Sequence, residues 1–240
     1  MGNIKENLDL VKNQIAKACI NAKRDPFDVS LIAVTKLHDP SEINEAIKCG
    51  ATDIGENKVQ EIMAKYEYVE GTVNWHLIGH LQTNKVKYIA DKVKMIHSVD
   101  SLRLAEEIEK RVSALGRTMD ILIQVNAAGE EQKSGVAIKD TEQLLKDILN
   151  TCPHIYVKGL MQVAPAAENP EDVRIYFKEV KNLYDKLAKE VSHPNMDFRF
   201  LSMGMSSDYQ VAIEEGSNMV RIGTAIFGAR DYSKDKKAEV

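Results

Sequence analysis

The chain has 240 residues, of which 44% are hydrophobic, and its 32 basic and 36 acidic side chains leave a formal net charge of −4. This length suits one large α/β domain or two small ones, and the apolar content excludes global disorder. The slightly acidic balance argues against a nucleic-acid partner. The three cysteines form no C-x-x-C pair, and no apolar run approaches the roughly 20 residues of a membrane span. We therefore expect a cytoplasmic protein without a membrane partner.

Hydrophobic periodicity predicts helices and short strands in alternation. Apolar residues spaced by three and four from Ile4 to Ala18 indicate an amphipathic helix before the first strand. Apolar runs rich in β-branched residues predict eight strands, at 29–35, 52–55, 75–79, 94–99, 119–125, 155–163, 198–203 and 218–222. Helical patterns follow these strands in turn, at 40–48, 59–68, 84–90, 102–115, 141–150 and 173–191, with a short one ending near 215.

Eight strand–helix units in a chain of this length fit a closed (β/α)8 TIM barrel, which typically has about 250 residues. A doubly wound open sheet is the competing α/β fold, but no two glycines lie two residues apart, so the dinucleotide-binding pattern G-x-G-x-x-G is absent. The simplest division is one barrel domain over 1–232, including the added N-terminal helix. A charged tail at 233–240 is expected to be disordered.

Histidines give no clear metal site. His76 and His80 are four residues apart, as in a zinc-binding helix, but Leu77 stands where that motif needs a glutamate. If the segment is a strand, the two histidines are about 13 Å apart and cannot share one metal. They are better interpreted as core or site-lining residues.

Polar side chains follow the first, seventh and eighth predicted strands, at the end of a barrel where active sites are built. Lys36 is either a strand-end lysine that reaches solvent or an amine that forms a Schiff base. Ser206 and Ser207 enter the helix after the seventh strand, and Gly223 and Thr224 follow the eighth. Turn and cap chemistry explains these residues, and so does phosphate binding.

Arg221 shares the alternating set of Gly223 on the eighth strand, so it could point inward. It either pairs with a carboxylate such as Glu56 or donates a hydrogen bond to a ring nitrogen. A lysine, a phosphate cradle and an arginine between them can hold one ligand with an aldehyde, a phosphate and a pyridine nitrogen. Pyridoxal 5′-phosphate (PLP), a form of vitamin B6, has these three groups.

Seven motifs extend this pattern over nearly the whole chain. They are AVTK at 33–36, GENKVQE at 55–61, WHLIGHLQTNK at 75–85, HSVD at 97–100, KSG at 133–135, LSMGMSSD at 201–208 and VRIGTAIFGAR at 220–230. With these motifs in this order, the chain resembles the YggS/PROSC family of pyridoxal phosphate homeostasis proteins. The resemblance implies a barrel like the N-terminal domain of alanine racemase, with PLP held as a Schiff base on Lys36.

The resemblance also implies roles for residues at matching positions. Ser206, Gly223 and Thr224 would bind the phosphate, and Arg221 would face the pyridine nitrogen. By the same resemblance, Asn57 and Met203 would line the ring pocket, and His80 and Lys133 would lie near the site mouth. Ser207 is a further phosphate candidate, from the position of its hydroxyl after the seventh strand.

One position departs from the family pattern. His38 stands where some relatives carry a second lysine. A cofactor relay through this position is therefore in doubt for this chain, whereas the linkage to Lys36 is unaffected.

Racemisation would need acid–base groups on both faces of the cofactor. Lys36 can serve one face, whereas racemase-like enzymes supply the other from a second, β-rich domain, and this chain ends soon after the eighth strand. Tyr209 is the nearest candidate for a second base and is better interpreted as a packing residue. An arginine at the ring nitrogen also disfavours the protonated pyridinium.

We therefore expect a non-catalytic, monomeric protein that binds PLP and related B6 vitamers, and that buffers PLP or delivers it to apo PLP-dependent enzymes. A PLP-dependent racemase-like enzyme is the first alternative. A phosphate-binding barrel enzyme without PLP is the second.

Overall fold

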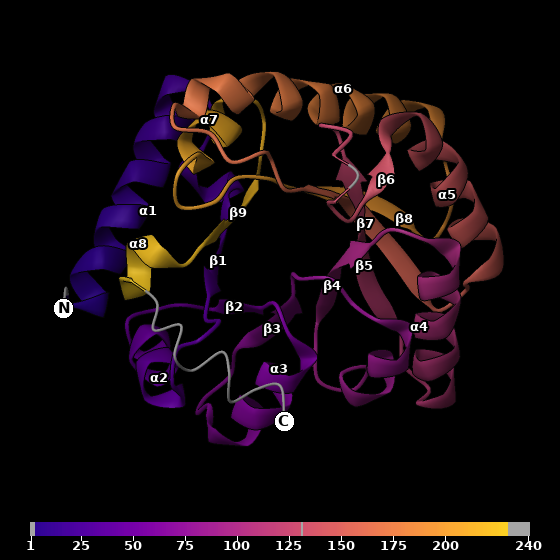
Figure 1. Cartoon of the computed structure of the whole chain (residues 1–240), viewed down its shortest axis with the longest axis horizontal. Coiled ribbons are helices and arrows are strands. Elements are labelled where there is room, and N and C mark those ends of the chain that lie inside the picture. The colour runs from indigo at the N-terminus through magenta and orange to yellow at the C-terminus, as the bar shows by residue number, and fades with distance from the viewer. Residues whose placement is uncertain (1–2, 131, 230–240) are drawn as a thin grey trace.

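The computed structural model describes residues 3–130 and 132–229, so the tail predicted at 233–240 lies outside the described residues. Within this part, eight parallel strands close into a barrel with helices around it (Figure 1), which confirms the predicted TIM barrel. The strands follow one another around the barrel, and the last pairs with the first. Their bounds are β1 (Ser30–Val34), β2 (Asp53–Glu56), β3 (Asn74–Leu77), β4 (Met95–Val99), β5 (Met119–Asn126), β7 (Ile155–Gln162), β8 (Met196–Ser202) and β9 (Met219–Ile222).

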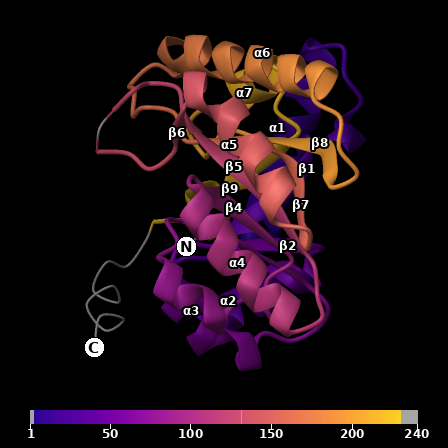
Figure 2. The ribbon, with the colours of Figure 1, turned by 90° about the vertical axis from the view of Figure 1, so that its right-hand side faces the viewer.

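The helices cover the outside of the barrel, and Figure 2 shows α4 and α5 on the side turned to the viewer, with α6 above them. The α-helices are α1 (Ile4–Asn21), α2 (Pro40–Lys48), α3 (Val59–Lys65), α4 (Leu102–Ala114), α5 (Ile138–Thr151), α6 (Arg174–Glu190), α7 (Tyr209–Glu214) and α8 (Thr224–Phe227). Short 3-10 helices join them: η1 (Pro26–Asp28), η2 (Tyr66–Tyr68), η3 (Thr83–Tyr88) and η4 (Pro170–Val173). No helix in the described ranges has the length and apolar character needed to cross a membrane.

The added N-terminal helix is present as α1, and its apolar stripe explains why it forms. Leu8, Val11 and Ile15 lie on one buried face, and the side chain of Asn3 caps the first turn by accepting a hydrogen bond from the Lys5 amide. The helix packs against α7 and α8, which follow the last two strands (Figure 1). The beginning of the described chain is thereby joined to its end.

Two local features differ from the predicted elements. The segment predicted as a helix at 84–90 is the 3-10 helix η3, in which the Lys85 amide donates to the Gln82 carbonyl and the Ile89 amide to the Val86 carbonyl. Such i→i+3 bonds form a tighter helix that is used in short connections. The structure also has a two-residue strand, β6 (Val136–Ala137), beside the carboxyl end of β5, which is too short for a periodic pattern to predict.

The barrel interior changes from apolar to polar along its axis. Its apolar layer consists of Ile32, Met95, Leu122, Met161 and Met219. Because alternate strand residues face the same side of a sheet, the next inward residue after Met95 is His97, and the next after Met219 is Arg221. The polar layer thus lies towards the carboxyl ends of the strands, where barrels bind ligands.

Candidate functional site

The carboxyl ends of four adjacent strands carry most of the residues singled out from the sequence. Strand β1 pairs with β2 on one side and with β9 on the other, and β9 also pairs with β8. Lys36 follows β1, Asn57 follows β2, Ser206 follows β8 and Gly223 follows β9. The closed barrel therefore brings residues that are far apart in the sequence into one sector of its rim.

The turn that carries Lys36 has an unusual backbone. Leu37, the next residue, has a φ of +65°, a value that residues other than glycine seldom adopt. Its amide donates to Oε2 of Glu61 over 2.7 Å, and the His38 amide donates to the Thr35 carbonyl over 3.1 Å. Such strain persists only where the surroundings hold it, so the position of Lys36 on the barrel rim is tightly determined.

His38 also packs this turn against α8. Its imidazole is buried, stacks on the Phe227 ring of α8 with 4.7 Å between centroids, and lies 3.2 Å from the carboxylate of Glu42. At the position where some relatives carry a second lysine, this chain therefore has a packed, hydrogen-bonded ring.

A buried ionic cluster lies behind the Lys36 turn. Nζ of Lys65 donates to Oε1 of Glu56 (2.8 Å), to Oε2 of Glu61 (2.7 Å) and to the carbonyl of Thr35 (2.9 Å). The Thr35 hydroxyl donates to Glu56 over 2.7 Å. Burial raises the pKa of Glu56 to about 7, although Lys65 opposes the shift. The cluster holds both the residue before Lys36 and, through Glu61, the residue after it.

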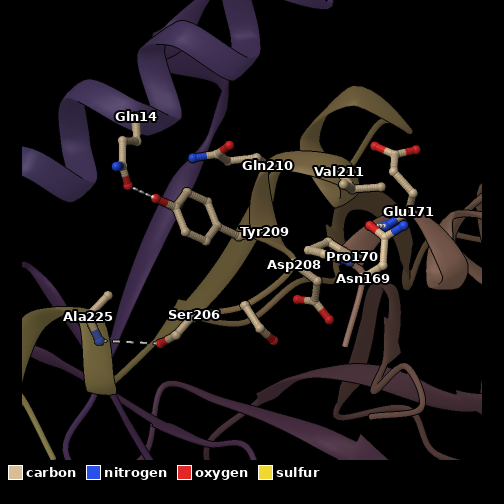
Figure 3. Close-up of a pocket in the computed structure, with 11 residues that line it drawn as sticks. Gln14, Asn169, Pro170, Glu171, Ser206, Asp208, Tyr209, Gln210, Val211 and Ala225 are labelled. Carbon is tan, nitrogen blue, oxygen red and sulfur yellow. Dashed lines mark hydrogen bonds between the residues drawn. The ribbon is translucent and has the colours of Figure 1, made fainter. Parts of the chain in front are cut away.

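The loops after β8 and β9 meet at one hydroxyl group. Oγ of Ser206 accepts hydrogen bonds from the amides of Gly223 (3.3 Å) and Ala225 (3.5 Å), and Figure 3 shows the second contact. Ser206 thus lies against the start of α8 rather than at the first turn of α7, which begins at Tyr209. Thr224, the first residue of α8, is exposed. Hydroxyl and amide donors from two loops are therefore gathered at the predicted phosphate position.

Gly204 lets the loop after β8 turn towards Ser206. Its φ is +92°, and a Cβ atom at this position would lie 2.7 Å from Cα of Tyr209 and 2.8 Å from Cβ of Ala212, both in α7. Its carbonyl accepts from the Arg221 amide over 3.0 Å. A side chain here would need both a strained backbone and a shift of α7.

Gly204→Ala is expected to lower the free energy of unfolding by about 3 kcal/mol, from about 1 kcal/mol of left-handed strain and about 2 kcal/mol of overpacking. Gly116→Ala is the matched control, because Gly116 also has a positive φ, of +62°, but no atom lies within 4 Å of its Cβ position. This control should lose only about 1 kcal/mol. Urea unfolding of the two variants measures both values, and equal losses would refute the collision with α7.

Arg221 is buried inside the barrel. Its Nη1 donates to the carbonyl (2.7 Å) and the hydroxyl (2.6 Å) of Ser202, and its Nη2 donates to the carbonyl of Gln162 (2.7 Å). Its Nε makes no hydrogen bond to any residue in the described part of the chain. Burial lowers the pKa of Arg221 to about 10, so the guanidinium stays charged at neutral pH. The ion pair with Glu56 that the sequence left open is wrong, because Glu56 bonds to Lys65 instead.

Asn57 and Met203 have different surroundings. Asn57 is partly exposed, and its backbone is packed so closely against the loop after β3 that a Cβ at Gly79 would lie 2.4 Å from the Asn57 carbonyl oxygen. Met203 is fully buried in the main apolar core. Their assignment to a ring pocket stays a prediction.

His80 and Lys133 lie in loops that meet across the barrel mouth. Nδ1 of His80 is 3.2 Å from the hydroxyl of Ser134, and Nζ of Lys133 contacts Glu130 (2.9 Å) and the Ala164 carbonyl (3.3 Å). These loops follow β3, β5 and β7, and β5 is four strands from β1 in either direction around the barrel. Lys133 therefore lies across the barrel from Lys36, whereas His80 follows β3, which pairs with β2 of the sector that carries Lys36.

A cavity of about 350 Å³ opens beside Ser206 (Figure 3). Ser207, which is exposed, and Tyr209, which is buried, line it together with residues of α1 and η4. The Tyr209 hydroxyl donates to the side chain of Gln14 in α1, which supports the interpretation of Tyr209 as a packing residue. Neither Lys36 nor Arg221 lines this cavity, so it adjoins the predicted site from outside the barrel.

Four polar residues inside the barrel were not predicted to interact: Asp53, His76, His97 and Ser202. They form a connected row that ends at Arg221. The sequence signal was their inward position in alternating strands, because a buried histidine or aspartate there needs polar partners. Identifying those partners needed the strand order.

This chain is similar to known proteins over nearly its whole length. A family model for the N-terminal domain of alanine racemase matches residues 2–231. The pyridoxal phosphate homeostasis protein of Aquifex aeolicus is 46% identical over 231 residues, which cover 96% of this chain and 100% of that protein. The protein of the same name from Escherichia coli K12 is 38% identical over 239 residues, covering 98% and 100%.

This chain belongs to the pyridoxal phosphate homeostasis protein family. The resemblance inferred from the seven motifs is thereby confirmed. A solved structure of PipY from Synechococcus elongatus with PLP bound is also similar, with a TM-score of 0.78 at 33% identity over 89% of this chain and 100% of that one. The barrel is thus a feature that this chain shares with PipY.

Proposed function

We propose that this protein binds PLP at the rim formed by β1, β2, β8 and β9, holds it covalently on Lys36, and buffers it or delivers it to apo PLP-dependent enzymes. The observation that carries the proposal is the convergence of a lysine, the Ser206 hydroxyl cluster and the charged Arg221 on adjacent strand ends. The names of the relatives and the PLP-bound PipY structure support it.

The donor set of this sector fits the chemistry of PLP. Ser206, Thr224 and the amides at the start of α8 would hold the phosphate, while the unused Nε of Arg221 offers a donor to the ring nitrogen. Ser207 is a further phosphate candidate beside them. When bound, PLP supplies an aldehyde that condenses with the amine of Lys36. The held turn around Lys36 would keep that amine in place.

Two features favour a carrier over an enzyme. Arg221 is a charged donor, so it would keep a proton off the ring nitrogen and weaken electron withdrawal by the ring. The hydroxyl of Tyr209 is engaged by Gln14 and buried, so it is not available as a second base. Racemase-like catalysis is the second candidate, because the family model that matches this chain is that of an alanine racemase domain.

The test combines absorbance with chemical trapping. The purified protein is mixed with PLP, reduced with borohydride, digested and mapped by mass. We expect a yellow absorbance band and one reduced adduct, on Lys36. Adducts scattered over exposed lysines, or no band, would contradict the proposed anchor. Incubation of the loaded protein with a panel of amino acids decides between carrier and enzyme, since sustained racemisation or transamination would reject the carrier.

We also propose that the protein is a monomer. Its large exposed apolar side chains are spread over separate elements, such as Leu10 in α1, Phe27 in η1, Tyr68 in η2 and Ile175 in α6. Sedimentation equilibrium should give a species near 26.9 kDa. A stable species of twice this mass would show that the monomer proposal is wrong.

A further inference from the structure

A row of hydrogen-bonded side chains crosses the barrel interior, and we call it the polar row. Oδ1 of Asp53 lies 3.0 Å from Nε2 of His76, whose Nδ1 lies 2.9 Å from Nε2 of His97. Nδ1 of His97 lies 3.3 Å from Oγ of Ser202, which also accepts from Nη1 of Arg221 over 2.6 Å. The five residues come from five strands, so only the closed barrel forms the row.

The polar row joins the two ends of the barrel. Asp53 is the first residue of β2, at the amino end, and 22% of its side chain is exposed. His76, His97, Ser202 and Arg221 are each no more than 3% exposed. The row thus connects a solvent-accessible carboxylate at one end with Arg221, the arginine proposed to contact the ligand, at the other.

The two ends determine the direction of every proton in the row. Arginine only donates, so the Ser202 hydroxyl accepts from Arg221 and must donate its own proton to Nδ1 of His97. His97 then carries its proton on Nε2 and donates to Nδ1 of His76. His76 in turn donates from Nε2 to Asp53, whose carboxylate only accepts. One arrangement satisfies every group, and in it both histidines are neutral Nε2–H tautomers.

The charges agree with this direction. Burial, together with the charge of Arg221, holds the pKa of His97 well below its usual value, so this ring is neutral. Burial would raise the pKa of Asp53, but hydrogen bonds from His76, Thr52 and Asn74 lower it to about 2. The row therefore has a cation at one end, an anion at the other and the neutral His97 ring between them.

We propose that the polar row is a positioning device, in which Asp53, His76, His97 and Ser202 orient the guanidinium of Arg221 and keep its Nε–H directed to the ring nitrogen of PLP. This inference rests on the proposed function, because it assigns the ring nitrogen as the partner of Arg221. The apolar layer of Ile32, Met95, Leu122, Met161 and Met219 shows that the same barrel can be filled without polar groups, which are costly to bury.

The test measures the histidine tautomers and PLP binding separately. In the ligand-free wild type at pH 7, ¹⁵N-histidine NMR should show His76 and His97 as Nε2–H tautomers. Ser202→Ala removes the hydroxyl beside Arg221, so PLP should bind about tenfold more weakly and its absorbance maximum should shift. Ser202→Thr keeps the hydroxyl and should bind PLP within about twofold of the wild type.

A variant far from the ligand site distinguishes an effect on the orientation of Arg221 from direct damage to the site. Asp53→Asn lies at the opposite end of the barrel from Lys36 and weakens the acceptor at the end of the row, so PLP affinity should fall about threefold. Asp120→Asn is the matched control, because Asp120 is also a half-buried carboxylate on a barrel strand but its nearest cation is Lys158, at 3.8 Å, outside the row. This control should bind PLP as the wild type does.

The outcomes distinguish this inference from the proposed function. Nδ1 protonation of His97 in the wild type would overturn the row's direction. Wild-type affinity and spectrum in both Ser202→Ala and Asp53→Asn would overturn its role while leaving PLP binding intact. If the wild type itself takes up no PLP, the proposed function fails, and the inference fails with it.

Discussion

Lys36→Ala is expected to abolish covalent attachment of PLP while leaving the fold and a weak, reversible affinity for PLP. The backbone around residue 36 is held by Glu61, Lys65 and Thr35, none of which depends on the Lys36 side chain for the contacts described above. The proposed phosphate and ring-nitrogen contacts would also remain. We expect the dissociation constant to rise about a hundredfold, which corresponds to about 2.7 kcal/mol.

Borohydride trapping and calorimetric titration measure the two effects of Lys36→Ala. Lys186→Ala is the control, because Lys186 is half-exposed and pairs with Glu142 on the outer surface. The control should keep the adduct and the affinity of the wild type. A trapped adduct of normal yield in Lys36→Ala would show that another lysine is the anchor.

Lys65→Met is expected to lower the free energy of unfolding by about 3–5 kcal/mol, because it leaves Glu56 and Glu61 buried without their cation. One oxygen of Glu56, Oε2, already lacks a hydrogen-bond partner among the described residues, so the carboxylate has little to replace Lys65. The loss also removes the bond to the Thr35 carbonyl. We therefore expect weaker PLP binding as well as lower stability.

The loss in free energy of unfolding caused by Lys65→Met should depend on pH. The pKa of Glu56, raised by burial to about 7, exceeds the ordinary value of 4.5, so the folded state holds a proton that the unfolded chain has released. Stability from this proton is fully present below about pH 4.5 and is lost as the pH rises through 7. Removal of Lys65 raises the pKa further, so the variant should recover stability between pH 8 and pH 5 more than the wild type does.

Urea unfolding at several pH values measures this dependence. The double variant Lys65→Met with Glu56→Gln is the control, because it removes the titrating group together with the cation and should flatten the pH profile over this range. If Lys65→Met loses the same free energy of unfolding at pH 5 and pH 8, the Glu56 carboxylate is not the cause of the loss.

Patterns within one segment predicted the elements and several strand-end residues. The stripe of α1 and the β-branched runs are local signals, and Lys36 and Ser206 were found because a strand end in a barrel is a functional position. The hydrogen-bonding partners of these residues, however, could not be predicted from patterns within one segment. Arg221 could bond to Glu56 or to another group, and the answer depends on which way each strand faces. Gly55 and Asn57 alternate with Glu56, which places its carboxylate outside the barrel with Lys65.

The contacts in the polar row were even harder to predict from the sequence. Asp53, His76 and His97 lie on three consecutive strands, but Ser202 is separated from His97 by 105 positions in the sequence. No spacing rule relates such residues, because their contact depends on the closure of the whole barrel. A helix was predicted near 84–90, but its 3-10 type was not, since a tight turn and the first turn of an α-helix share the same short-range pattern.

The pairing of β1 with β9 also has a consequence for folding. Lys36 follows the first strand and Gly223 follows the last, so the proposed binding site is completed only when the two ends of the sheet join. This contact spans most of the chain, and contacts of such sequence separation form slowly. A ligand that contacts residues after both β1 and β9 would bind the closed barrel but not its open precursors. It would therefore slow the opening of the barrel, and the midpoint temperature of unfolding would rise as the ligand concentration increases.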